Sequence, residues 1–184
     1  EGDNATLHFL DTVRGSDWGA DQEVARIFAE EARIAVRELA HFGVPWPRVR
    51  GGKNTYFITG ERVESEEARE NDGLIMHRAI GGTAKWRACY AAAGTGHAVL
   101  YAVDSEVVRL GVTVRDRTEA VELIHDGSRC WGAVARCQRT GEHYPILAKA
   151  TVIATGGYGR IYGQFTTNAT INEGMGAAIA LNTG

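Results

Sequence analysis

The sequence contains a turn of small residues whose backbone N–H groups could bind a phosphate or contact an aromatic ring. Ala154, Thr155, Gly156 and Gly157 directly follow the β-branched run Thr151–Ile153. Glycines have no Cβ, so their backbone N–H groups can approach a phosphate or an aromatic ring closely, and a preceding strand would hold the turn rigid. The G-x-G-x-x-G fingerprint of dinucleotide-binding turns fails here, because the sixth position counted from the second glycine is a tyrosine. An ordinary turn at the end of a strand is the alternative, and glycine content alone does not decide between the two.

Five polar side chains are further candidates for chemistry, and a structural role is the expectation for each. His77 and His97 lie near glycine-rich segments, but a lone histidine is more often a structural hydrogen-bonding group. Of the two, His97 is assigned to a helix start or an interface. Arg87 could pair with a carboxylate or a phosphate, and a solvated or structural salt bridge is the expected use. Asp17 and Asp21 lack the apolar setting that raises a carboxyl pKa for acid catalysis, so both are interpreted as helix caps.

Composition excludes several classes of function. The chain has 184 residues and a net charge of −3, which gives no electrostatic footprint for nucleic acid. It contains no apolar run near the roughly 18 residues of a membrane span and no signal-peptide pattern. Three cysteines without metal-ligand spacing indicate reduced thiols and no metal site: Cys89, Cys130 and Cys137. The absence of an initiator methionine and an end at a helix cap lead us to expect a partial chain.

The first half of the sequence predicts two helices separated by an irregular region. Apolar residues at helical spacing predict an amphipathic helix beginning after Asp17 or Asp21 and stopping at Gly43. Residues 44–80 are interpreted as a turn-rich excursion, with a short hairpin within 44–72. Val99 to Leu110 fits a second helix, which Gly111 closes.

The second half predicts strands and a final helix. Five segments have strand character, and they read VTVRD, EAVELIH, CWGAVARCQ, HYPILAKA and TVIATGG. The middle segments, separated by turns at Asp126-Gly127 and at 140–142, predict an antiparallel meander. Asn172 can cap a last helix within 172–184.

Four separated motifs, taken in order, resemble a known family. They read DTVRGSDWGADQEVA, FGVPWPR, GGTAKWRACYAAAGTGH and ATGGYGRIY followed by TTNA. Together they resemble the flavoprotein subunit of fumarate reductase and succinate dehydrogenase, especially the quinol:fumarate reductase type. The resemblance implies an FAD-dependent oxidoreductase that interconverts fumarate and succinate by hydride transfer at flavin N5. L-aspartate oxidase shares the flavin-domain layout and is the alternative enzyme, and a binding or scaffold module without catalysis is the alternative from another class.

The resemblance also implies a fold. The expected class is α/β, a partial Rossmann-like FAD-binding domain with a doubly wound sheet and an antiparallel β-meander, lacking its first strand. Residues 1–184 would form the central part of that domain, and residues 172–184 would begin the helix that leads to a substrate-capping domain. The catalytic residues of the family and the glycine fingerprint would then lie outside this chain.

Site residues follow from the same comparison of motifs. Glu119 and Ala120 match the strand whose backbone brackets the adenine of FAD, and residues 154–157 match the turn beside its phosphate and ribose. Many relatives carry Gly-Asp-Gly at the start of the last helix, where this chain has Met175 between two glycines. Two roles are open to Glu173: it takes over the lost cofactor contact, or it only places a favourable charge near the helix start. Those two alternatives remain open.

Partners are implied in the same way. An iron–sulfur subunit and a membrane anchor subunit would accept or supply electrons, and a small dicarboxylate, fumarate or succinate, would be the substrate. Because the sequence has no spanning segment, the subunit would be peripheral, on the cytoplasmic side of the cell membrane. No nucleic-acid partner is expected.

Overall fold

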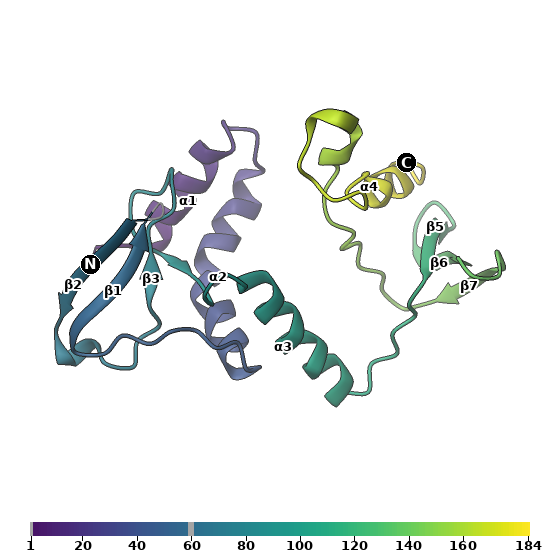
Figure 1. The fold of residues 1–184 in the computed structure, drawn as a ribbon. Coiled ribbons are helices and arrows are strands. Elements are labelled where there is room, and N and C mark those ends of the chain that lie inside the picture. Colours follow the sequence, from purple (N-terminus) through teal and green to yellow (C-terminus); the bar gives the residue numbers. More distant parts are fainter. Residues whose placement is uncertain (1, 59–60) are drawn as a thin grey trace. The chain divides into compact units, whose positions relative to one another are not determined.

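The computed structural model describes residues 2–58 and 61–184, and the chain forms two compact units (Figure 1). The first unit runs to Val112 and the second begins at Thr113. Each unit has its own helices and its own antiparallel strands.

Two helices open the first unit, and a side chain caps each of them. Helix α1 spans Ala5–Gly15, and its N-cap Asn4 accepts a hydrogen bond from the amide of Leu7 at 2.9 Å. Helix α2 spans Gln22–His41, and the Asp21 carboxylate accepts from the amide of Val24 at 3.0 Å. The predicted Asp21 cap is therefore confirmed. Helix α1 was not predicted from the sequence, although an asparagine before helically spaced apolar residues is a usable start signal.

The turn between these helices corrects the interpretation of Asp17. Asp17 and Trp18 have φ of 52° and 65°, in the left-handed region that most side chains avoid. Asp17 thus lies in the tight connection after α1 and does not cap α2, which begins after Asp21.

A hairpin and a third helix complete the first unit. Strands β1 (Gly52–Ile58) and β2 (Glu61–Glu67) pair antiparallel, and a 3-10 turn, η1, covers Arg69–Asn71. Two-residue strands β3 (His77–Arg78) and β4 (Ala88–Cys89) pair next. Helix α3 spans Thr95–Arg109, and Gly111 with φ 66° follows it. The predicted hairpin and the glycine-closed helix are both present.

The main core of the first unit joins α2, α3 and the segment between α2 and β1. Val44, Trp46, Ala91 and Ala102 are buried together. The Trp46 indole donates to the carbonyl of Val36 in α2 at 3.1 Å, which satisfies its one polar atom inside the core. The segment after α2 is thereby held against that helix.

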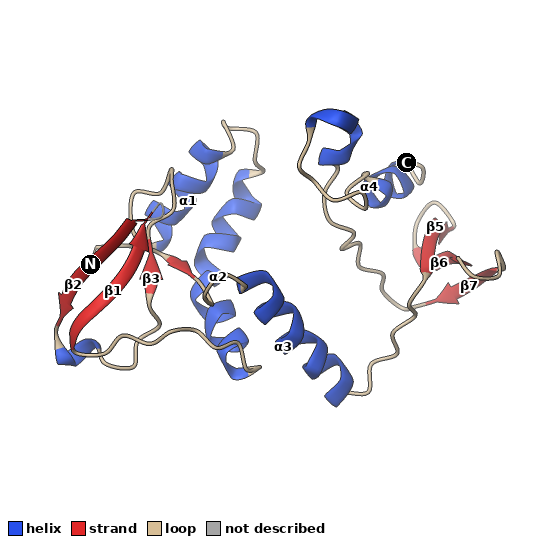
Figure 2. Ribbon diagram, in the orientation of Figure 1, coloured by secondary structure: helices blue, strands red, loops and turns tan. Residues whose placement is uncertain are grey.

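The second unit contains the predicted meander (Figure 2). Strands β5 (Thr118–His125), β6 (Cys130–Cys137) and β7 (His143–Leu147) form one antiparallel sheet in that order. The Asp126 carboxylate closes the first turn by accepting from the amides of Ser128 and Arg129, each at 2.9 Å. A 3-10 segment, η2 (Gly159–Phe165), and helix α4 (Met175–Leu181) follow.

Three sequence-based expectations in this unit are wrong. VTVRD and TVIATGG are not strands, because strands require a hydrogen-bonded neighbour and no described segment pairs with either of them. Val152 is 86% exposed, whereas Ile153 lies close to Gly176 of α4, so this β-branched run meets a helix on one side and pairs with no strand among the described residues. Asn172 is not a helix cap, because α4 begins at Met175 behind Gly174, whose φ is 80°. The Asn172 side chain donates instead to that of Asn168 at 3.3 Å.

The α/β class and the antiparallel meander are confirmed. All sheet pairings among the described residues are antiparallel, so the doubly wound parallel sheet stays a prediction. No helix in the described ranges is long and apolar enough to cross a membrane.

Candidate functional site

The backbone of Ala120 faces the open edge of the meander. The amide of Gln138 donates to the carbonyl of Arg117 at 2.9 Å, so these two residues form a hydrogen-bonded pair. Such pairs alternate with non-hydrogen-bonded pairs along an antiparallel ladder. Ala120 pairs with Ala135 three positions further along, so this pair is of the non-hydrogen-bonded kind. The N–H of Ala120 therefore points away from β6, beyond the edge strand β5, and the ladder becomes irregular directly after it, between Ala120 and Glu122.

The neighbouring Glu119 side chain is already paired. Its carboxylate accepts a hydrogen bond from the guanidinium of Arg136, its cross-strand neighbour in β6. Both side chains remain partly exposed, so this pair contributes at most about 1 kcal/mol to sheet stability. By the same alternation Glu119 and Arg136 form a hydrogen-bonded pair, so the backbone N–H and C=O of Glu119 are directed at β6 and its carboxylate is paired as well.

The turn of small residues is extended, exposed and open on one side. Residues 154–157 are all exposed. Gly156 has φ 76°, which a residue with a side chain adopts only under strain, and a Cβ there would lie 3.2 Å from the Asn172 side-chain oxygen. A Cβ on Gly157 would meet no atom within 4 Å. A glycine at position 156 is thus explained by the backbone conformation and the nearby Asn172 side chain. Gly157, in contrast, has no close neighbour on the side where a Cβ would lie.

Helix α4 packs closely on this turn. A Cβ on Gly176 would overlap the hydroxyl oxygen of Thr155, and a Cβ on Gly174 would lie 2.9 Å from the Cβ of Tyr158. The same helix contacts β5. Helix α4 therefore brings two of the predicted site segments, residues 154–157 and the strand of Ala120, against one element. Glu173 lies exposed just before the helix cap.

Two asparagines brace the turn, and sequence reasoning missed both of them as site residues. The amide of Arg160 donates to the backbone carbonyl of Asn172 at 2.9 Å, and a Cβ on Gly159 would overlap the side chain of Asn168. The usable signal was the pair of asparagines four residues apart in a loop that follows a glycine-rich turn.

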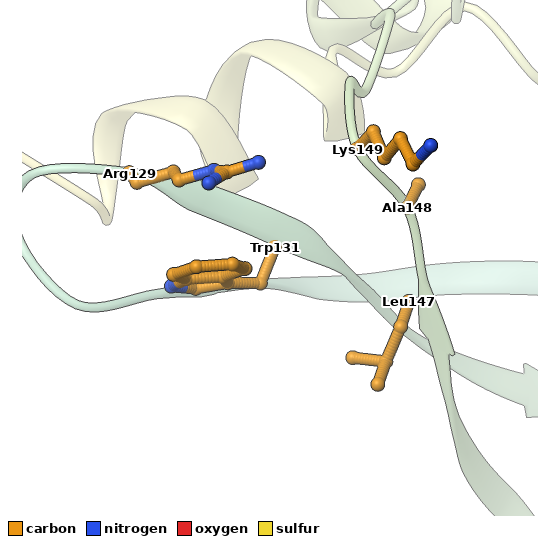
Figure 3. A pocket seen from close by; sticks show the side chains of 5 residues that line it. All are labelled: Arg129, Trp131, Leu147, Ala148 and Lys149. Atoms are coloured by element: carbon orange, nitrogen blue, oxygen red, sulfur yellow. The ribbon is translucent and has the colours of Figure 1, made fainter.

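A shallow hollow of about 280 Å³ lies on the meander, lined by Arg129, Trp131, Leu147, Ala148 and Lys149 (Figure 3). The Arg129 guanidinium carbon lies 4.2 Å from the centroid of the Trp131 ring. The indole N–H donates to the Asp126 carboxylate at 2.9 Å. Arg129 and Lys149 are both exposed, so water can satisfy their donors, and the hollow contains no buried side-chain polar atom without a partner among the described residues.

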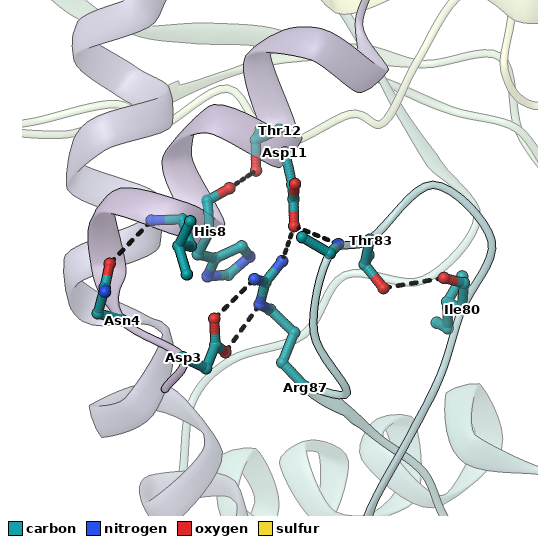
Figure 4. Close-up of polar contacts among 10 residues, drawn as sticks. Asp3, Asn4, His8, Asp11, Thr12, Ile80, Thr83 and Arg87 are labelled. Atoms are coloured by element: carbon teal, nitrogen blue, oxygen red, sulfur yellow. Dashed lines mark hydrogen bonds and ion pairs between the residues drawn. The ribbon is translucent and has the colours of Figure 1, made fainter. Parts of the chain in front are cut away.

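In the first unit, Arg87 joins a helix to a distant loop (Figure 4). Its guanidinium donates to both carboxylate oxygens of Asp3, at 2.9 and 2.7 Å, and to one oxygen of Asp11. The same Asp11 oxygen accepts from the amide of Ala84 at 2.9 Å. Side-chain exposure is 12% for Arg87 and 11% for Asp11, so this contact is largely shielded from water. The expectation of a structural salt bridge is confirmed.

These contacts shift the proton affinity of the groups involved. Hydrogen bonds from Arg87 lower the pKa of Asp3 and of Asp11 below the usual 3.8, and the two carboxylates raise the pKa of Arg87. Burial, followed by the charge of Arg87, lowers the pKa of His8 in the same cluster. All three charged groups therefore keep their charges at neutral pH and serve packing rather than proton transfer.

The two candidate histidines are held by secondary structure. His97 lies in the first turn of α3, with its ring centroid 6.0 Å from that of Tyr101, which confirms the helix-start assignment. His77 lies in β3 opposite Cys89 and is exposed. Cys89, Cys130 and Cys137 are free thiols, and the described residues contain no group of three potential metal ligands.

The donor set on the second unit fits the adenine end of FAD. A backbone N–H at the edge of a sheet can donate to an acceptor nitrogen on an adenine edge, and the N–H of Ala120 is directed outward. Gly157 leaves room for a close backbone approach. These two features require neither rearrangement nor loss of an existing contact.

Comparisons with known proteins identify a family that binds FAD. The family described as FAD binding domain matches residues 1–184. The chain is 50% identical over 184 residues to the fumarate reductase flavoprotein subunit of Helicobacter pylori, covering all of this chain and 26% of that protein. It is 34% identical to the 8-methylmenaquinol:fumarate reductase flavoprotein subunit of Wolinella succinogenes, again over the whole chain and 27% of the relative.

A solved structure agrees in fold. The chain superposes on the FrdA chain of E. coli quinol fumarate reductase with a TM-score of 0.77 and 29% identity, over 99% of this chain and 28% of that one. The chain therefore spans about a quarter of the length of these relatives. Because the family match extends over every residue, the chain belongs to the FAD-binding domain family.

Proposed function

We propose that this chain is the central part of the FAD-binding domain in the flavoprotein subunit of a fumarate reductase or succinate dehydrogenase. The observation that carries the proposal is 50% identity, over the whole chain, to the fumarate reductase flavoprotein subunit of Helicobacter pylori. The four ordered motifs span the same chain. In this proposal the whole protein interconverts fumarate and succinate.

The role of this chain is to hold the adenosine part of FAD. The outward N–H of Ala120 donates to the adenine edge, and the preceding residue Glu119 holds this part of β5 to β6 through its pair with Arg136. The backbone of residues 154–157 lies against the phosphate and ribose, with Gly157 providing the close approach. Glu173, exposed beside α4, accepts from a cofactor hydroxyl in place of the aspartate that many relatives carry. When bound, FAD supplies hydride transfer to or from the dicarboxylate at its N5 atom.

Residues 172–184 begin the connection to a substrate-capping domain, and the catalytic side chains belong to the rest of the whole protein. An iron–sulfur subunit and a membrane anchor subunit exchange electrons with it, at the cytoplasmic side of the membrane. The names of the relatives, which include a quinol fumarate reductase and the flavoprotein subunit of an 8-methylmenaquinol:fumarate reductase, support such an assembly. Whether electrons run toward fumarate or from succinate depends on the potentials of those partners.

The deciding experiment uses the whole protein with its FAD. A reduced low-potential dye as donor and fumarate as acceptor should give turnover, and succinate should compete with fumarate. The purified protein should show a visible flavin spectrum with one FAD per subunit. Oxidation of L-aspartate by oxygen without fumarate turnover would assign the chain to an L-aspartate oxidase instead, and a colourless protein would leave only a binding or scaffold role.

A further inference from the structure

A second cavity, of about 310 Å³, lies in the first unit and is not used by the proposed FAD contacts. It is lined by Arg78, Tyr90, Ala92 and Ala93. Arg78 belongs to β3, and Tyr90 follows the paired strand β4, so hydrogen-bonded backbone fixes both attachment points. This volume is in the range of small-molecule sites in proteins.

The cation in this cavity is held in place by an anchored ring. The Arg78 guanidinium carbon lies 5.0 Å from the centroid of the Tyr90 ring. The Tyr90 hydroxyl donates to the sulfur of Met76 at 3.0 Å, and Met76 is buried against Val49. Because the ring is fixed by this small core, the guanidinium plane has a preferred position over it.

The guanidinium of Arg78 forms no ion pair with a described side chain. The guanidinium of Arg87, in contrast, pairs with two carboxylates. It carries five N–H donors, and its contact with the Tyr90 ring uses only its face. Arg78 is partly buried, so water satisfies these donors less completely than at an open surface. A partly shielded cation with free donors at a cavity is a site for an anion.

We infer that this cavity binds a carboxylate, to which Arg78 donates two parallel hydrogen bonds while Tyr90 and Ala92 contact the attached carbon atoms. A carboxylate fits better than a phosphate, because a phosphate needs donors for three oxygens and the remaining lining residues present alanine methyl groups and a tyrosine ring. The carboxylate belongs either to a free small acid or to an aspartate or glutamate side chain elsewhere in the whole protein.

Chemical modification of the whole, FAD-loaded protein tests the inference at one residue. Phenylglyoxal reacts with accessible guanidinium groups, and mass spectrometry of peptides reports each arginine separately. With succinate as the probe, at ten times its dissociation constant, modification of Arg78 should slow by about tenfold. Arg37, exposed on α2, is the internal control and should react at an unchanged rate. An Arg78 that reacts and is not slowed by succinate overturns the inference.

An Arg78 that is unreactive without succinate points to a carboxylate from the protein itself, and two variants test that case. Arg78→Lys keeps the charge, and Arg78→Gln removes it. A paired carboxylate requires the lysine variant to keep most of the thermal midpoint that the glutamine variant loses. Equal midpoints for the two variants would mean that only apolar atoms cover Arg78, and the inference would be wrong. Neither readout depends on fumarate turnover, so the result is separable from the proposed function.

Discussion

Gly176 of α4 lies so close to Thr155 that a Cβ at position 176 would overlap the threonine hydroxyl oxygen. Both residues belong to the second unit, and Gly176 is buried. The contact fixes the start of α4 against the segment that leads into the glycine turn. We therefore expect Gly176→Ala to lower the free energy of unfolding of the whole protein by about 2 kcal/mol through overpacking. Urea denaturation measures this, with Ala177→Ser on the exposed side of the same helix as the control, expected within about 0.5 kcal/mol of wild type.

Gly157→Ala separates a cofactor contact from a packing contact. No atom of the chain lies within 4 Å of a Cβ at this position, so stability without FAD should be unchanged. If FAD lies against Gly157, the added methyl group should weaken FAD binding by about tenfold, which corresponds to about 1.4 kcal/mol. Titration of the FAD-free whole protein with FAD measures this change. An unchanged dissociation constant would remove Gly157 from the proposed site.

Ala120→Pro tests the outward-facing backbone of β5. Proline removes an N–H that does not take part in the β5–β6 ladder, so the sheet should persist, as edge strands tolerate proline at such positions. FAD binding should weaken by up to about tenfold, the value of one lost hydrogen bond. Ala120→Val keeps the N–H and should bind FAD as wild type does. Equal FAD affinity of the two variants would argue against an adenine contact at Ala120.

Arg87→Met should destabilise the first unit by about 2 kcal/mol, because the largely shielded carboxylate of Asp11 and the more exposed carboxylate of Asp3 lose their partner. The matched control is Arg26→Met, which breaks exposed pairs within α2 and should cost less than about 1 kcal/mol. Denaturant unfolding at neutral pH compares the two variants. Equal losses would show that the Arg87 contacts are no stronger than surface ion pairs.

The same contacts set a pH dependence. The folded-state pKa values of Asp3 and Asp11 lie below the usual 3.8, so their contribution to stability is complete above about pH 4 and is lost as the pH falls through the lowered values. The difference in unfolding free energy between wild type and Arg87→Met should therefore shrink on acidification below about pH 4. A difference that stays constant between pH 6 and pH 2 would contradict the assignment of these shifts to Arg87.

The amino-acid sequence by itself determined the parts of this protein that depend on near neighbours. The Asp21 cap, the helical spacing of α2 and the turn at Asp126-Gly127 are local signals, and each produced the expected element. The ordered motifs likewise identified the family, because each motif is a contiguous stretch of sequence and can be recognised without knowing its place in the fold.

Only the tertiary structure decided which distant residues meet. Arg87 pairs with Asp3 and Asp11, which precede it by 84 and 76 residues, and no local pattern encodes such partners. Residues 151–157 have strand composition and remain unpaired, because a strand exists only where another backbone supplies its hydrogen bonds. The outward direction of the Ala120 N–H follows from its register with β6 and not from its side chain. Local propensity determines where helices and turns form. Strand register and long-range packing determine which of their atoms a ligand can reach.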